Sequence, residues 1–113
     1  MGFELSEKHL QLQQSVKNYV EQSILSEISR YEEKSILPVD MFRKLGEKGF
    51  LRAHIPEAHG GLGLGSIAYC LVCEELGKAG AGMIHNGHFQ TGKMLIQYGT
   101  QTQKRKYLEK ELL

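Results

Sequence analysis

A glycine-rich stretch between Ile55 and Ala68 is the first segment whose composition could carry chemistry. It reads IPEAHGGLGLGSIA, and its end, GLGSIA, matches the loose dinucleotide-binding pattern G-x-G-x-x-G/A. That pattern holds a diphosphate when a strand precedes it and a helix follows, because backbone N–H groups and the helix N-terminus then meet the phosphates. The preceding run, Leu51 to His59, is short and broken by Pro56. We therefore predict a glycine-rich turn into a helix capped by Ser66.

Two cysteines and two histidines form the second candidate site. Cys70 and Cys73 are spaced as C-x-x-C, and His85 and His88 follow as H-x-x-H, which together resemble a zinc site. A zinc finger places its cysteines on a hairpin, and a redox C-x-x-C lies at a helix N-terminus, where the dipole lowers the thiol pKa. Here the cysteines fall within a predicted helix of bulky apolar residues. We therefore expect buried core cysteines and no bound metal.

The segment IHNGHFQTGKM is the third candidate, because it places two glycines inside a predicted helix. Gly87 and Gly92 each cost roughly 1 kcal/mol relative to alanine at such positions, and local conflicts of this kind often mark functional sites. Gly87, Thr91 and Met94 fall near one face of the helix. Two interpretations remain open, since the glycines could admit a ligand close to the backbone or a neighbouring helix.

The elements that must position these candidates are predicted to be helices, because apolar residues recur at three- and four-residue spacing. No segment shows sustained β alternation, and no repeat is visible. We predict helices at residues 6–24, 38–48, 66–78 and 83–98, and from Thr100 onward. The charged stretch from Ser26 to Leu37 is expected to be a helix end and a connection. The predicted fold class is all-α, a bundle of about five helices.

Capping residues mark several of the predicted helix ends. Ser6 is a favourable N-cap for the first helix, and Pro38 suits the first position of the second. Gly99 is expected to end the fourth helix. Thr100 and Gln103 have the spacing of a capping box, in which the hydroxyl and the amide each accept a backbone N–H.

Length, composition and charge restrict the class of protein. The 113 residues suffice for one domain, residues 1–113, and 41% hydrophobic with 24% charged residues is ordinary for a globular protein. The net charge of +1 disfavours nucleic acid as a partner. No apolar run is long enough to span a bilayer, and the N-terminus is too polar for a signal peptide. Two cysteines without a signal peptide indicate a reducing, cytoplasmic location.

Three segments, in this order and spacing, resemble one known family. They are MFRKLGEKGFLRAHIPEAHGGLGLG, AYCLVCEELGK and QYGTQTQKRKYL. The chain resembles the N-terminal helical domain of the acyl-CoA dehydrogenases over about Leu5 to Leu108. The resemblance implies that the glycine-rich block is a turn into a buried helix. One departure is Glu109, where family members often have proline.

The resemblance also implies a reaction. Family members use FAD to remove two hydrogens from an acyl-CoA thioester, and we expect an acyl-CoA substrate and an electron-transfer partner. In the family the flavin lies mainly against a β domain and a C-terminal helical domain, and the catalytic base comes from the C-terminal part. Those parts lie outside residues 1–113, so no catalytic or cofactor-binding residue is assigned. The chain is expected to be inactive alone and to form a homo-oligomer through its uncovered apolar surface.

A set of substrate-contacting residues follows from the same resemblance. In the family, the helix before the Tyr-Gly-Thr turn faces the fatty acyl tail. By alignment, this implies that the wall of an acyl pocket includes Asn86, Gly87, Gln90, Thr91 and Met94. The alternative is a stand-alone helical protein-interaction module that has lost the chemistry.

Overall fold

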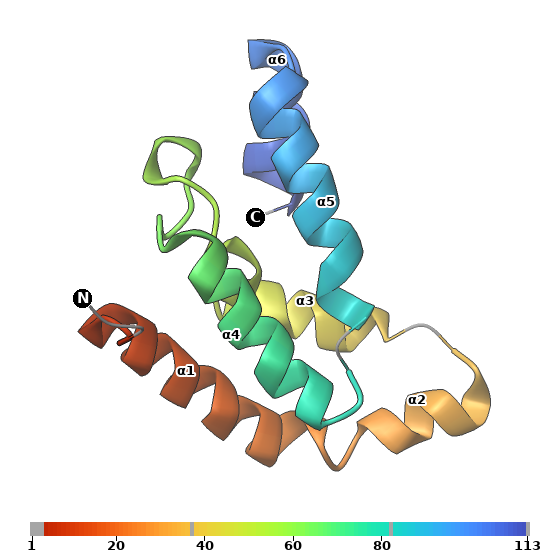
Figure 1. Cartoon of the computed structure of the whole chain (residues 1–113). Coiled ribbons are helices and arrows are strands. Elements are labelled where there is room, and N and C mark those ends of the chain that lie inside the picture. Colours follow the sequence, from red (N-terminus) through yellow and green to blue (C-terminus); the bar gives the residue numbers. More distant parts are fainter. Residues whose placement is uncertain (1–3, 37, 82, 113) are drawn as a thin grey trace.

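The computed structural model describes residues 4–36, 38–81 and 83–112, with the side chains of 83–87 and 109–112 outside that description. The described residues form helices and turns and contain no strand, which confirms the all-α prediction (Figure 1). The α-helices are α1 Glu7–Tyr19, α2 Ile28–Lys34, α3 Val39–Glu47, α4 Gly65–Lys78, α5 Met83–Tyr98 and α6 Gln101–Gln103. Two π-helical segments, η1 Val20–Ile24 and η4 Lys104–Leu112, and two 3₁₀ turns, η2 Phe50–Arg52 and η3 Glu57–His59, complete the fold.

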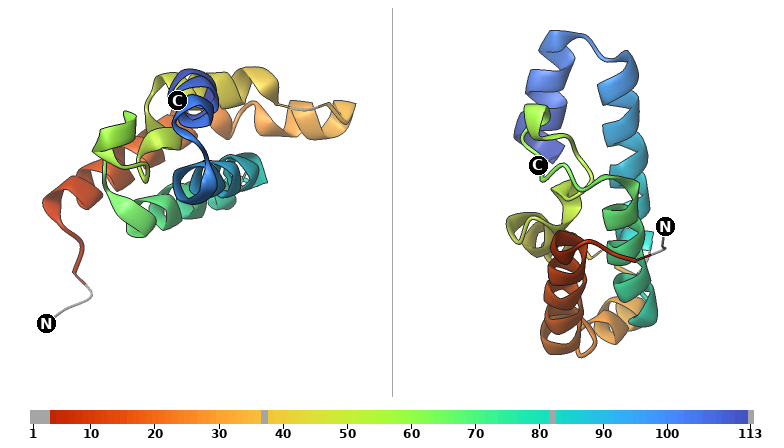
Figure 2. Two further views of the ribbon diagram at one scale, coloured as in Figure 1. Left: turned by 90° about the horizontal axis from the view of Figure 1, so that it is seen from above. Right: turned by 60° about the vertical axis from the view of Figure 1, so that its left-hand side comes forward.

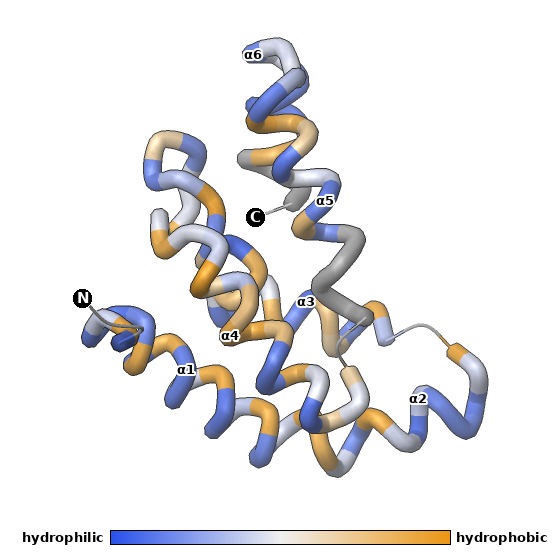
Figure 3. Tube along the Cα trace, in the orientation of Figure 1, coloured by the Kyte–Doolittle hydropathy of each residue, from blue (hydrophilic) through white to orange (hydrophobic). Residues whose placement is uncertain are grey.

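The first helix buries a regular apolar stripe. Ser6 is its N-cap, as predicted, and its hydroxyl accepts the backbone N–H of His9. The buried side chains recur every four residues and are Leu12, Val16, Val20 and Ile24. Figure 3 shows the resulting alternation of hydrophobic and hydrophilic residues along α1. A spacing of four exceeds the 3.6 residues of an α-helical turn. The wider turn of η1, closed by a bond from Leu25 N to the Val20 oxygen, accommodates the last step of that stripe.

The partner of α1 is α4, and the two helices lie side by side (Figures 1 and 2). Ala68, Val72 and Leu76, four residues apart on α4, are completely buried. His9 Nε2 donates to the carbonyl oxygen of Leu64 at 2.8 Å, which fixes the start of α4 against α1. We call the contact between these two buried stripes the α1–α4 seam.

Helix α2 was not expected, because the sequence predicts a connection there. It carries an ion pair between Glu27 and Arg30 at 2.9 Å, and it ends at Ser35, whose φ of 50° is left-handed. None of its residues is fully buried, which agrees with its weak apolar pattern. Ile28 and Tyr31 nevertheless pack against the core. Pro38 is the N-cap of α3 and not its first residue, whereas the predicted end near residue 48 is confirmed.

The C-terminal part forms a helical hairpin in which η4 returns beside α5 (Figure 2). The predicted bounds of α5 are confirmed, and the turn carries the predicted capping box. In that box the Gln103 N–H donates to Thr100 Oγ1 at 3.2 Å, and the Thr100 N–H donates to Gln103 Oε1 at 2.9 Å. Leu108, on η4, is completely buried. We call α5, α6 and η4 together the α5 arm.

The molecule is a flat slab. Its extents are 40 × 39 × 18 Å, so the shortest dimension is less than half of either of the others. Its radius of gyration of 14.5 Å exceeds the value of about 13 Å expected for a compact chain of this length. A slab this thin leaves one side of most helices uncovered. Within the described residues, no helix is both long and apolar enough to cross a membrane.

Candidate functional site

The five residues predicted to face an acyl chain all lie in α5. Asn86, Gln90 and Met94 follow one another at four residues, and Gly87 and Thr91 are also four apart on the adjoining part of the same side of the helix. Gln90 and Thr91 are exposed, and Met94 is 65% exposed. The side chain of Asn86 and the surroundings of Gly87 lie outside the described residues. Their contact with an acyl chain stays a prediction.

Tyr98 extends the same exposed side by one turn. It follows Met94 at four residues and is 80% exposed. We call the side of α5 formed by Gln90, Thr91, Met94 and Tyr98 the α5 outer face. A large methionine and a tyrosine left in solvent on one face indicate a surface that another group covers.

The opposite side of α5 packs against the rest of the chain. His88 and Gly92 are buried there. A Cβ at Gly92 would lie 3.3 Å from Ile55 Cδ1 and 4.0 Å from Leu108 Cδ1. Gly92 therefore serves close packing, one of the two interpretations left open by the sequence. For Gly87 both interpretations remain open.

Four rings lie between α5 and its neighbours and hold the helix in place. The rings of Tyr69 and Phe89 stack with centroids 3.7 Å apart and an angle of 19°. His54 lies 4.9 Å from Phe89 and 6.3 Å from His88, measured between ring centroids. We call these four residues the aromatic layer. It couples α4, α5 and the segment after η2, and so it positions the α5 outer face.

Two members of the aromatic layer, His54 and Tyr69, are uncharged near neutral pH. Burial, assisted by the nearby charges of His88 and Lys93, lowers the pKa of His54 to about 4. A hydrogen bond with the side chain of Cys73, together with burial, raises the pKa of Tyr69 to about 12. His54 is thus neutral imidazole and Tyr69 is neutral phenol. His54 and Tyr69 therefore bring no charge to the side of α5 that lies opposite to the outer face.

The glycine-rich loop folds against its own chain. The N–H groups of Leu62, Gly63 and Leu64 donate to the carbonyl oxygens of Arg52, Ile55 and Ala53 at 3.1, 2.8 and 2.9 Å. A Cβ at Gly61 would lie 2.0 Å from the Ile55 oxygen, so only glycine permits this approach. The predicted turn into a helix is confirmed. The N-cap of α4 is Leu64, however, without a side-chain bond, and the prediction that Ser66 caps it was wrong.

The cysteines do not form the buried pair that we predicted. Cys70 is exposed and Cys73 is half-buried, because α4 turns Ala68, Val72 and Leu76 towards α1 and Cys70 away from it. Burial raises the pKa of the Cys73 thiol, which disfavours the reactive thiolate. His88 lies in the aromatic layer, and the side chain of His85 is outside the described residues. Among the side chains described, no group of three or more potential ligands could hold a metal ion.

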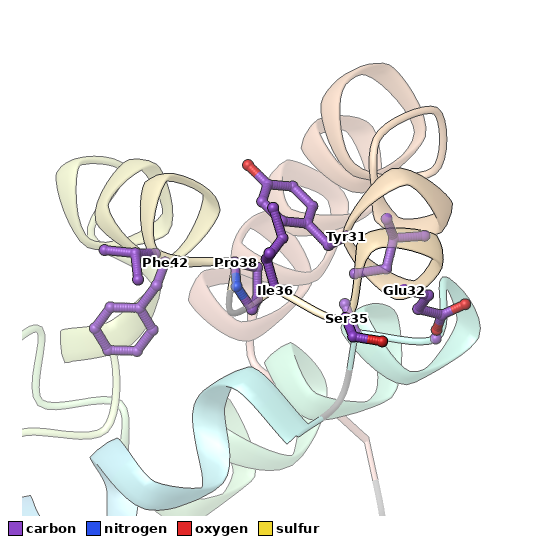
Figure 4. Close-up of a pocket in the computed structure, with 10 residues that line it drawn as sticks. Tyr31, Glu32, Ser35, Ile36, Pro38 and Phe42 are labelled. Carbon is purple, nitrogen blue, oxygen red and sulfur yellow. The ribbon is translucent and has the colours of Figure 1, made fainter.

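Sequence reasoning missed an apolar groove between α2 and α3, with a volume of about 610 Å³. Its apolar side chains are Ile28, Tyr31, Ile36, Pro38, Val39 and Phe42. Glu32 and Ser35 add polar groups on the α2 side, across from Phe42 (Figure 4). Gly80 and Ala81 complete the described lining. The missed helix explains the missed groove, although Ile28 and Tyr31, three residues apart, were a detectable signal.

Comparison with known proteins identifies the class to which this fold belongs. Residues 6–112 match the family profile described as acyl-CoA dehydrogenase, N-terminal domain. The chain therefore belongs to the acyl-CoA dehydrogenase family and corresponds to its N-terminal, all-helical domain.

Individual relatives agree with this assignment. A probable acyl-CoA dehydrogenase of Bacillus subtilis is 32% identical over 108 residues, covering 93% of this chain and 18% of the relative. A second from that species, YngJ, is 31% identical over 111 residues, covering 96% and 29%. A probable acyl-CoA dehydrogenase of Mycobacterium bovis is 33% identical over 79 residues, covering 70% and 20%. The chain thus spans less than a third of the length of these relatives.

Proposed function

We propose that this chain acts as the N-terminal domain of an FAD-dependent acyl-CoA dehydrogenase, and that the α5 outer face forms part of the wall of its acyl pocket. The observation that carries the proposal is the exposed outer face, with Met94 65% and Tyr98 80% exposed, on a helix whose opposite side packs against the aromatic layer. Met94 and Tyr98 are the two most exposed of the large hydrophobic side chains described, and they lie four residues apart on one face. Membership of the family supplies the substrate class, an acyl-CoA thioester.

The part played by this chain is binding and exclusion of water. Each methylene of an acyl chain that leaves water on the wall contributes about 0.8 kcal/mol. Met94 offers a flexible apolar side chain that adapts to such a chain, while Gln90 and Thr91 border it with polar groups. None of these side chains moves a proton in the reaction we propose. The isolated chain is expected to be inactive.

FAD, when bound to the complete enzyme, accepts hydride from the substrate. The glycine-rich loop of this chain does not fit its diphosphate, because the N–H groups from Gly60 to Leu64 donate to the chain's own carbonyl oxygens. We therefore assign no flavin contact to this loop. In our proposal the flavin is held by the parts of the enzyme outside residues 1–113.

The flat shape leaves surface at which other domains of the enzyme or a second copy of the chain can bind. A slab 18 Å thick with exposed Met94, Tyr98 and Ile67 offers apolar surface for other domains and for a second copy. We propose a homo-oligomeric enzyme in the cytoplasm that passes electrons to an electron-transfer partner. The exposed apolar residues and the charge of +1 do not favour nucleic acid.

Replacing Gly87 by leucine in the complete enzyme tests the pocket wall. We expect Gly87→Leu to lower kcat/KM for dodecanoyl-CoA at least tenfold more than for butanoyl-CoA, because the leucine fills space needed by two or three buried methylenes, each worth about fourfold. The measurement is the rate of acyl-CoA-dependent reduction of an artificial electron acceptor with both substrates.

Gly77→Leu is the matched control. Gly77 is an exposed glycine inside α4, and a Cβ there meets nothing within 4 Å. This variant should leave kcat/KM unchanged for both substrates. If Gly87→Leu lowered kcat/KM equally for both chain lengths, Gly87 would not belong to the wall of the acyl pocket and would be a packing residue. A complete gene product that ends at Leu113 and binds no flavin would favour the interaction module instead.

A further inference from the structure

Cys70 and Cys73 form a pair of thiols that the function proposed above does not use. We propose that this pair is a site of reversible thiol–disulfide exchange, at which a small disulfide such as oxidised glutathione modifies Cys70, and Cys73 then closes an internal disulfide that disconnects Tyr69 from Cys73. The inference rests on side chains of α4 and α5 and needs neither an acyl-CoA nor a flavin. It can therefore succeed or fail independently of the proposed function.

The spacing of the two cysteines permits the bond. Both lie inside α4, three residues apart, where the Cα atoms of an ideal helix are about 5 Å from each other. Disulfides join residues whose Cα atoms are about 4.4–6.8 Å apart. The Cβ atoms of such a helical pair are about 5–6 Å apart, whereas a disulfide holds them at about 3.5–4.5 Å. The helical turn must tighten for the bond to close, and a bond closed under such constraint is readily reduced.

The two thiols differ in exposure, which sets the order of the steps. Cys70 is exposed, while Cys73 is half-buried, and burial raises the pKa of the Cys73 thiol. A small disulfide in solution therefore reacts with Cys70 first. Cys73 reacts slowly with solutes, but its attack on a modified Cys70 takes place within one helical turn, and this proximity offsets its low fraction of thiolate.

The exchange proceeds in two steps. The Cys70 thiolate attacks one sulfur of the small disulfide, the S–S bond of that molecule breaks, and one small thiol leaves. The Cys73 thiolate then attacks the Cys70 sulfur and releases the second small thiol. The two cysteines together lose two electrons, which reduce the small disulfide, and their two protons end on the two small thiols. An excess of small thiol reverses both steps, as expected of a transient bond in a reducing compartment.

The thiol pair is connected to α5 through Tyr69. The Tyr69 hydroxyl makes a hydrogen bond with the side chain of Cys73, and the Tyr69 ring stacks on Phe89 of α5 with centroids 3.7 Å apart. A Cys73 sulfur drawn towards Cys70 leaves this hydroxyl. Closure of the disulfide therefore changes the surroundings of a ring that holds α5 in place.

The pKa of Tyr69 reports on closure of the disulfide. In the reduced protein the hydrogen bond with Cys73, burial, and the charges of the Cys73 and Cys70 thiolates raise this pKa to about 12. A disulfide carries no charge, so it removes all of these causes except burial. The pKa of Tyr69 should therefore be lower in the disulfide form than in the reduced form.

Intact-mass spectrometry of the 113-residue chain after incubation with oxidised glutathione tests the chemistry. We expect the wild type to lose two hydrogen atoms and to retain no glutathione. Cys73→Ser is the matched control, because it keeps the exposed thiol, lacks the second one, and should retain one glutathione. Cys70→Ser should take up glutathione at least about tenfold more slowly than Cys73→Ser, because Cys73 is half-buried.

NMR of the Tyr69 and Phe89 rings tests the connection to α5. Closure of the disulfide should shift the resonances of both rings and lower the pKa of Tyr69, measured on its ring carbon at alkaline pH. Excess reduced glutathione should restore the original spectrum. Tyr69→Phe should still form the disulfide but show a smaller shift at Phe89, because the hydroxyl that contacts Cys73 is absent. Circular dichroism checks that each variant keeps its helices.

Several results would overturn the inference. They are a wild type that keeps its hydrogen atoms, a wild type that retains one glutathione as Cys73→Ser does, and a disulfide that joins two chains in place of two residues of one chain. Unchanged resonances of Tyr69 and Phe89 after closure would also overturn it, because the bond would then have no effect on α5.

Discussion

The α1–α4 seam and the α5 arm are built in different ways. In the seam, side chains from both helices lie between 0% and 8% exposed, at regular four-residue spacing. In the arm, the described buried residues are His88, Gly92 and Leu108, while Met94 and Tyr98 stand in solvent. The seam is closed by its own apolar side chains. The arm is held by stacked rings and by a close approach at a glycine.

This difference separates stability from function. A seam made of interdigitated aliphatic side chains tolerates little change of volume. The aromatic layer fixes the arm while leaving the α5 outer face free for another group. We infer that changes in the seam act on the free energy of unfolding, and that changes on the outer face act on binding.

The largest expected effect is in the seam. Leu76 is completely buried, so Leu76→Ala should lower the free energy of unfolding by about 2–5 kcal/mol through lost burial and a residual cavity. Leu10→Ala is the control. Leu10 lies on α1 and is itself 50% exposed, so this change should lower the free energy of unfolding by less than about 0.5 kcal/mol. Urea denaturation followed by circular dichroism measures both. If the two variants lost similar free energies of unfolding, the α1–α4 seam would not be the main source of stability.

An intermediate effect is expected where the arm meets the rest of the chain. His54 has a pKa of about 4 in the folded protein and about 6.5 when unfolded. Its contribution is fully present above pH 6.5 and is lost as the pH falls towards 4, because the unfolded chain then binds the extra proton. The loss amounts to at most about 3 kcal/mol.

The pH dependence is measured as a difference between proteins, since carboxylates also titrate at acidic pH. Urea denaturation at pH 7.5 and 4.5 is compared for the wild type, His54→Gln and the control His59→Gln. The wild type and the control should lose more stability on acidification than His54→Gln does. Equal losses in all three proteins would show that the aromatic layer does not keep His54 neutral.

The smallest effect on folding is expected on the α5 outer face. Tyr98 is 80% exposed, so Tyr98→Lys should change the free energy of unfolding by less than about 0.5 kcal/mol. The same change should reduce self-association of the chain, because it places a charge on an exposed apolar surface. Light scattering over a range of protein concentrations measures this. A wild type that stays monomeric at every concentration would refute self-association.

Most of the fold was predictable because its helices carry strong local signals. The bounds of α5, the Thr100 capping box and the buried stripe of α1 follow from spacing and capping residues alone. Helix α2 was not predictable in this way, because no residue in it is buried and its stability depends on packing by Ile28 and Tyr31. Tertiary contacts override a weak local pattern.

The site was less predictable than the fold. Phosphate binding by the glycine-rich loop could be rejected from the sequence, because no strand precedes the loop. The reason for its glycines, the approach of Gly61 to the Ile55 oxygen, became visible only in the structure. Cys70 was expected in the core because α4 is apolar on nearly all sides. An apolar helix does not reveal which of its sides the slab leaves open. The groove was missed because it depends on α2, for which the sequence offers only the weak signal of Ile28 and Tyr31.

The two regions also differ in the order in which a growing chain can complete them. The hydrogen bond between His9 and Leu64 joins residues 55 positions apart, whereas α5 and η4 are neighbours in sequence. During synthesis, the stripe of α1 has no partner until α4 has left the ribosome, and closing that long loop carries an entropic cost. Until then the apolar stripe of α1 stays exposed on the nascent chain, where it can aggregate.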